Sequence, residues 1–172
     1  DAYRAFGDVR DRDTALAIAR YVAREMTDES GAFYSAQDAD SEGEEGKFFV
    51  WSKDEFEATL GHDASLVALA SAHWGVTAGG NFEGSGSTVL HVAESDAAIA
   101  RRTGAAFADV FAALDTARRR LLMARELRPK PFRDEKILVS WNALMVGALA
   151  VAGGAFGDPE LVKMAERAFD VL

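Results

Sequence analysis

The sequence contains no cysteine among its 172 residues. This absence excludes a disulfide framework, a thiolate metal site and a thiol nucleophile. No apolar run approaches the about 20 residues that a membrane-spanning helix needs, and no signal-peptide pattern opens the chain. We therefore expect no membrane partner and, by default, a cytoplasmic location.

Basic residues are also scarce: 19 lysines and arginines stand against 28 aspartates and glutamates, for a net charge of −9. No basic stripe is present that could neutralise phosphates, so we expect no nucleic-acid partner. The apolar content of 49% is enough to bury a core, and the length is typical of one domain. We predict that residues 1–172 form a single domain cut from a longer chain, because DAYRAF and AERAFDVL read as helix interiors.

Acidic residues gather in the stretch from Gly31 to Trp51. Five carboxylates fall within eight residues, and aromatic residues flank them on both sides. Carboxylates offer acid–base chemistry or metal ligation, and aromatic faces suit sugars and other half-polar ligands. The sequence therefore places its candidate site in this acidic stretch. The carboxylates are Asp38, Asp40, Glu42, Glu44 and Glu45.

Most of the remaining sequence has the apolar periodicity of helices. The pattern predicts an all-α fold of helical hairpins with one β-hairpin excursion near residues 33–51, its strands being Phe33–Ala36 and Lys47–Trp51. One predicted helix, residues 137–152, is apolar nearly all round and should be buried on most sides. We expect Gly153-Gly154 to end it. No strand–helix alternation is present, which disfavours a doubly wound sheet.

Three motifs occur in the order DADSEGEEGKFFVW, GNFEG followed by VLH, and RELRPKPFRDEKILVSWNALM. With these motifs the chain resembles the YyaL-like, spermatogenesis-associated thioredoxin-domain family over nearly its whole length. The resemblance implies part of an (α/α)6 toroid similar to six-hairpin glycosidases and N-acylglucosamine 2-epimerases. It also implies a thioredoxin-like domain elsewhere in the full-length chain as a partner.

Asp38 and Asp40 are the candidate catalytic pair. In an extended segment, residues two apart face the same side at roughly 6 to 7 Å, near the low end of the carboxylate spacing of inverting glycosidases. One acid would donate a proton while the other activates water. The alternative is a hairpin tip whose acids cap turns and face solvent.

Calcium is a second alternative for the same stretch. The run Asp38-x-Asp40-x-Glu42-Gly43 begins like an EF-hand loop, but the bidentate glutamate expected at the twelfth position is Phe49. We therefore predict no metal, and no cofactor.

The loop after residue 124 carries a second charged cluster. Arginine can hold a carboxylate or phosphate through two hydrogen bonds, so we predict that this cluster orients an anionic group of the ligand. The alternative is a set of ion pairs that tie this loop to the acidic tip of the predicted hairpin. The members are Arg125, Arg128, Asp134 and Lys136.

Aromatic and amide side chains complete the predicted ligand site. Tyr34, Trp51 and Trp141 could stack on a sugar ring. Asn142, Asn81 and Glu83 could bond its hydroxyl groups, beside Glu45 of the acidic stretch. For Trp141 and Asn142 the alternatives are a core position and a hydrogen bond to loop backbone.

The histidines His62, His73 and His91 lie outside the main motifs, which weakens an epimerase assignment because epimerases of the toroid class are expected to use histidine. Two hypotheses remain. The first is a region that acts on or binds a carbohydrate-like small molecule. The second is a non-catalytic interaction module that partners the thioredoxin-like domain. An incomplete set of hairpins would expose apolar faces, so we also expect self-association of the isolated fragment.

Overall fold

The computed structural model describes residues 1–61 and 63–172, so His62 lies outside the described residues. Eight α-helices occur in this described part, with only two-residue strands between them. The prediction of a mainly helical fold is confirmed, whereas the partial toroid stays a prediction. The chain divides into two compact units, residues 1–38 with 132–172 (unit 1) and residues 39–131 (unit 2). The single domain over 1–172 also stays a prediction.

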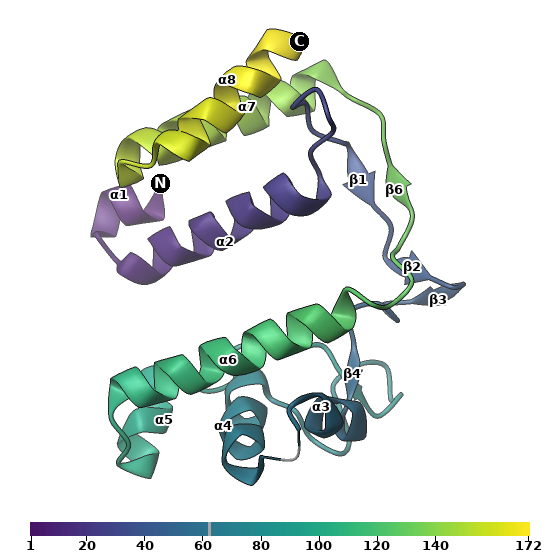
Figure 1. Cartoon of the computed structure of the whole chain (residues 1–172), viewed down its shortest axis with the longest axis vertical. Helices are drawn as coiled ribbons and strands as arrows, with labels where there is room; N and C mark the ends of the chain where they lie inside the picture. Colours follow the sequence, from purple (N-terminus) through teal and green to yellow (C-terminus); the bar gives the residue numbers. More distant parts are fainter. Residues whose placement is uncertain (62) are drawn as a thin grey trace. The chain divides into compact units, whose positions relative to one another are not determined.

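Unit 1 contains four helices and one strand pair. The helical hairpin of α7 and α8 lies beside α2 (Figure 1). Its core joins Ala19 and Val22 of α2 to Leu149 of α7 and to Leu161 and Ala165 of α8. The elements are α1 (Ala2–Phe6), α2 (Val9–Glu25), β1 (Ala36–Gln37), β6 (Arg133–Asp134), α7 (Val139–Phe156) and α8 (Pro159–Val171).

The glycine pair in α7 does not end the helix, so that prediction is wrong. A Cβ atom at Gly153 would lie only 2.6 Å from Cγ2 of Val162 on α8. Glycine is therefore present because the two helices approach closely, and α7 continues to Phe156 before Gly157 caps it in the left-handed conformation.

The prediction that α7 is buried on most sides is also wrong. Its buried residues are Asn142, Leu149 and Gly153, while Leu144 remains 74% exposed. The reason is that α7 contacts α8 and α2 along one side only within unit 1. Among the described residues, α7 is the one helix that is long and apolar enough to cross a membrane, by length and composition only. In this structure 17% of that helix is buried.

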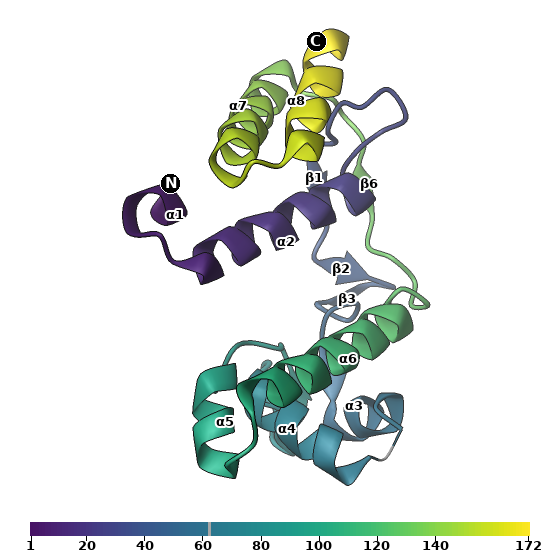
Figure 2. The same cartoon turned by 60° about the vertical axis from the view of Figure 1, so that its left-hand side comes forward.

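Unit 2 packs three helices against α6. Figure 2 shows α4 and α5 along α6, and α3 also contacts it. The core places Phe56 of α3, Trp74 of α4 and Leu114 of α6 together. The elements are β2 (Asp40–Ser41), β3 (Glu44–Glu45), β4 (Trp51–Ser52), α3 (Lys53–Thr59), α4 (Ala64–Trp74), β5 (Ser87–Thr88), α5 (Asp96–Thr103) and α6 (Phe107–Arg125).

The β-hairpin lies inside the predicted range but is smaller than expected. Its strands are the acidic residues themselves, Asp40 paired with Glu45 and Ser41 with Glu44. Glu42 and Gly43 form the two-residue turn with φ of 56° and 80°, as the twist of a tight hairpin requires. Of the two segments predicted as its strands, only the last residues are in strands: Ala36 in β1, which pairs with β6, and Trp51 in β4, which pairs with β5. Residues 47–49 form a turn, so the predicted strand pairing is wrong.

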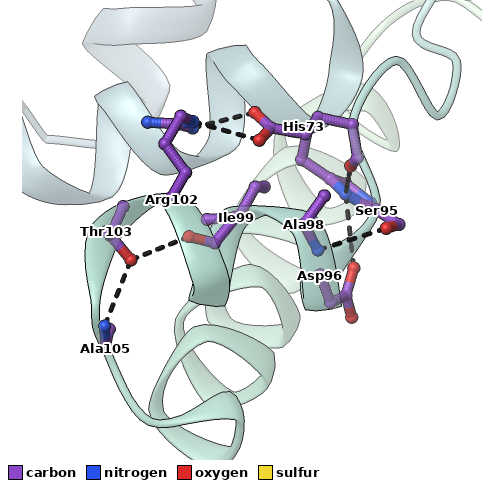
Figure 3. Close-up of polar contacts among 9 residues, drawn as sticks. His73, Ser95, Asp96, Ala98, Ile99, Arg102, Thr103 and Ala105 are labelled. Atoms are coloured by element: carbon purple, nitrogen blue, oxygen red, sulfur yellow. Dashed lines mark hydrogen bonds and ion pairs between the residues drawn. The ribbon is translucent and has the colours of Figure 1, made fainter.

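Buried His73 joins two helices of unit 2. Its Nδ1 atom lies 2.8 Å from the carbonyl oxygen of Glu94 and 3.3 Å from a carboxylate oxygen of Asp96. Figure 3 shows this contact beside the Ser95 hydroxyl, which accepts a hydrogen bond from the backbone N–H of Ala98. The histidine thus links α4 to the start of α5.

Candidate functional site

The acidic hairpin forms one side of a pocket of about 390 Å³ in unit 2, here called the hairpin pocket. Its wall combines four glutamates with serine hydroxyls and two phenylalanine rings, Phe48 and Phe82. A wall of this kind offers hydrogen-bond acceptors around an apolar surface, which suits a polyhydroxylated ligand. The glutamates are Glu42, Glu44, Glu45 and Glu55, and the serines are Ser41, Ser52, Ser85 and Ser87.

Two cations balance part of the acidic charge of the hairpin pocket. Lys47 donates to Glu44 at 2.7 Å and lies 3.5 Å from Glu42, and Arg128 pairs with Glu55 at 2.8 Å. The hydrogen bond to Glu44 is the main reason why the pKa of Lys47 is raised. Glu45 has an exposed side chain, so it can offer its carboxylate to a ligand.

Arg128 holds the wall of the hairpin pocket in place. Its guanidinium group donates to the carbonyl oxygens of Phe48 at 2.7 Å and of Val50 at 2.9 Å. The same group lies 4.1 Å from the ring centroid of Trp51. Trp51 is only 2% exposed, and one face of its indole is covered by this contact. Arg128 therefore has a clear structural role beside its predicted contact with ligand.

Arg125, Asn81 and Glu83 lie around this region of unit 2. The Arg125 guanidinium lies 5.4 Å from the ring centroid of Phe48, a cation–π distance. Asn81 closes the glycine-rich loop of residues 77–90, because its side chain donates to the carbonyl of Val89 at 3.0 Å and accepts from the N–H of Val89 at 2.7 Å. Glu83 is exposed with φ of 44°, a conformation uncommon for a non-glycine residue.

The side chain of Asn142 in unit 1 bonds to loop backbone, which was the alternative to ligand contact. Its Oδ1 atom accepts from the N–H of Phe33 at 2.7 Å, and its Nδ2 atom donates to the carbonyl of Phe33 at 2.9 Å. The side chain is 1% exposed. The adjacent Trp141 is 52% exposed, so its ring is available for stacking.

The other predicted residues of unit 1 are partnered through the β1–β6 region. The Arg133 guanidinium lies 4.1 Å from the ring centroid of Tyr34. Lys136 donates to Asp134 at 3.1 Å, and this bond is the first reason why the pKa of Asp134 is lowered. The Asp38 backbone N–H donates to the carbonyl of Phe132 at 2.7 Å, while its side chain is exposed.

The predicted site residues are thus divided between the two units. Asp38 belongs to unit 1 and Asp40 to unit 2, so the spacing expected for this pair stays a prediction. Within the part of the chain that the structure describes, no three histidine, aspartate or glutamate side chains form a group that could hold a metal ion.

Sequence reasoning missed several residues that line the hairpin pocket. Glu55 follows the acidic stretch, and Phe82 and Ser85 come from the glycine-rich loop. Phe82 packs against Gly46, where a Cβ atom would lie 2.9 Å from Cζ of the ring. This contact joins distant segments of the chain, so no local sequence pattern could have revealed it.

No protein-family model matches the sequence. Over 95% of its length the chain is 37% identical to spermatogenesis-associated protein 20 of Homo sapiens, and equally to that of Mus musculus. An uncharacterised protein of Caenorhabditis elegans is 28% identical over 84% of the chain. The chain is therefore homologous to one region of spermatogenesis-associated protein 20. It spans about a quarter of the length of these relatives, 24% for the human protein and 22% for the worm protein.

Proposed function

We propose that this region of the family binds a carbohydrate-like small molecule in the hairpin pocket. The observation that supports the proposal is the wall of that pocket, in which four glutamates and four serines surround the rings of Phe48 and Phe82. Carboxylates accept hydrogen bonds from sugar hydroxyls, and an aromatic ring covers the apolar face of a pyranose. The volume of about 390 Å³ lies within the range of small-molecule sites.

Catalysis is a second step of the proposal and rests on Asp38 and Asp40. Asp40 pairs with Glu45 across the hairpin, so it adjoins a residue of the pocket wall. We assign to the pair the acid and base roles of a glycosidase-like or epimerase-like reaction. If binding occurs without turnover, the region is a binding module that works beside the thioredoxin-like domain of the full-length protein.

The experiment is a thermal-shift and calorimetry screen of the full-length protein with mono- and disaccharides. A ligand that binds only the native state stabilises it by about 2.7 kcal/mol at 100 times Kd. We expect a sugar to raise the melting temperature and Glu45→Gln to weaken its binding about tenfold. Glu29→Gln serves as the matched control, because Glu29 is an exposed glutamate outside the pocket.

The catalytic step is tested separately with Asp38→Asn and Asp40→Asn. Each variant should keep sugar binding but lose turnover of the sugar that binds. Full turnover by Asp38→Asn would remove it from the catalytic pair. If no sugar binds at millimolar concentration, the carbohydrate proposal itself is wrong.

A further inference from the structure

A second pocket of about 250 Å³ lies in unit 2 and is here called the tryptophan pocket. Five of its lining residues are apolar and two are arginines, Arg118 and Arg125. Of the residues predicted to contact a sugar, Trp51 and Arg125 line this pocket. Arg118 was not among the predicted ligand contacts. The apolar residues are Trp51, Trp74, Leu90, Leu121 and Leu122.

The two tryptophans form a rigid wall. Trp51 and Trp74 are only 2% and 8% exposed. Phe56 contacts both indoles edge to face, with ring centroids 6.4 Å from Trp51 and 6.2 Å from Trp74. Because this aromatic cluster belongs to the core of unit 2, the pocket is held open by packing and needs no rearrangement to accept an apolar group.

The charge of this pocket is opposite to that of the whole chain. The net charge is −9, yet among the described residues that line the tryptophan pocket there are two arginines and no acid. Arg118 and Arg125 are seven residues apart on α6, about two helical turns, so they lie on one face of the helix. The pocket therefore combines an apolar interior with positive charge on one wall.

Arg118 is the cation best placed to receive an anion. Its side chain is 57% exposed and its nearest acidic partner, Asp115, is 3.9 Å away. That separation is well beyond the 2.7–2.9 Å of a charge-assisted hydrogen bond. The planar guanidinium can therefore bind a carboxylate with two parallel hydrogen bonds. Arg125 adds positive charge from its position over the Phe48 ring, 5.4 Å from the centroid.

We propose that the tryptophan pocket binds a small apolar carboxylate, with its ring or branched chain against Trp51 and Trp74 and its carboxylate on Arg118. Size supports a ligand of this class. A cavity of roughly 150 Å³ holds benzene, so about 250 Å³ accommodates a phenyl ring with a short acidic chain. The proposal is independent of sugar binding in the hairpin pocket, because the two pockets share no lining residue.

The test is calorimetric titration of the full-length protein with 3-phenylpropionate and with its neutral amide, 3-phenylpropionamide. We expect the carboxylate to bind and the amide to bind about tenfold more weakly, since only the carboxylate forms the charged pair. Arg118→Gln should remove this preference while leaving the affinity for the amide unchanged.

Arg101→Gln is the matched control. Arg101 is an exposed arginine on α5 of the same unit and does not line the pocket, so the preference for the carboxylate should survive. Leu122→Trp should fill the pocket and abolish binding of both probes. The proposal is overturned if the two probes bind equally, if neither binds at a concentration of about 10 mM, or if Arg118→Gln and Arg101→Gln have the same effect.

Discussion

The hairpin pocket and the tryptophan pocket lie in the same 93-residue unit (39–131), but their walls differ in charge and in polarity. Four glutamates and four serines line the first, while two tryptophans, three leucines and two arginines line the second. The first consists of loop and hairpin residues around Phe48 and Phe82, and the second is a gap at the edge of the helical core. One unit thus offers a polar, acidic surface from its loops and an apolar, basic one from its helices.

Arg128 and Trp51 connect the two walls. Arg128 lines the hairpin pocket and covers one face of Trp51, which lines the tryptophan pocket. The same aromatic core therefore supports both pockets, so we expect some substitutions to affect both pockets and others to affect only one.

Gly80→Ala should disrupt both pockets. Gly80 has φ of +61°, and a Cβ atom there would lie 2.1 Å from the carbonyl oxygen of Ser87. Ser87 lines the hairpin pocket, and Leu90 of the same loop lines the tryptophan pocket. We expect a loss of about 3 kcal/mol in local stability from strain and clash, measured by hydrogen exchange over residues 81–90 in the full-length protein.

The control for this variant is the adjacent residue. Gly79→Ala meets no atom within 4 Å and has no positive φ. Its effect should stay within about 0.5 kcal/mol. Equal protection in the two variants would show that the loop tolerates a displaced Ser87.

Gly46→Ala should alter the hairpin pocket alone. At φ of +72°, a Cβ atom would lie 2.9 Å from Cζ of Phe82, so the ring must move out of the pocket wall. We expect about fivefold weaker sugar binding and unchanged binding of 3-phenylpropionate, each measured by calorimetry, with a stability loss of about 1 kcal/mol from the left-handed backbone.

Gly43→Ala separates backbone strain from the displacement of Phe82. Gly43 also has positive φ, +80°, but a Cβ atom there meets nothing within 4 Å. The Gly43→Ala variant should lose about as much stability as Gly46→Ala and keep its affinity for the sugar. A similar loss of affinity in both variants would mean that the hairpin conformation, and not the Phe82 ring, determines binding.

The smallest expected effect is the change in the charge of Lys47, in the hairpin pocket, with pH. The pKa of Lys47 is raised, chiefly by its hydrogen bond to Glu44. A raised pKa in the folded state stabilises the fold below the ordinary lysine pKa, and this contribution is lost as the pH rises through the folded value. The hairpin pocket should therefore lose the positive charge of Lys47 only at alkaline pH.

This response can be followed by NMR titration of lysine side chains labelled with ¹³C. Glu44→Gln should lower the Lys47 midpoint toward the ordinary lysine value. Lys163, whose pKa is raised by Glu160, should keep its midpoint in that variant. No difference between the Lys47 midpoints with and without Glu44 would contradict the contact.

Much of the helical structure could be predicted because helix ends obey local rules. Ser52, Asp63, Ser95 and Asp158 are of the residue types that favour the position before a helix, and each accepts a hydrogen bond from a backbone N–H of the first turn. The acidic hairpin was placed within the right residues, but its strand partners were wrong. A pattern of strand-like residues shows that a segment is extended and does not show which segment it pairs with.

The helices, their caps, the net negative charge and the acidic cluster follow from the sequence, because each depends on composition or on residues close together in the chain. The hydrogen bonds from Asn142 to the backbone of Phe33, 109 residues away, and the close approach of α8 to Gly153 are visible in the tertiary structure alone. The same holds for the positions of the pockets. The hairpin pocket brings residues 41–55 together with 82–87 and 128–129. Such a wall depends on packing between distant segments, which apolar periodicity and turn chemistry do not encode.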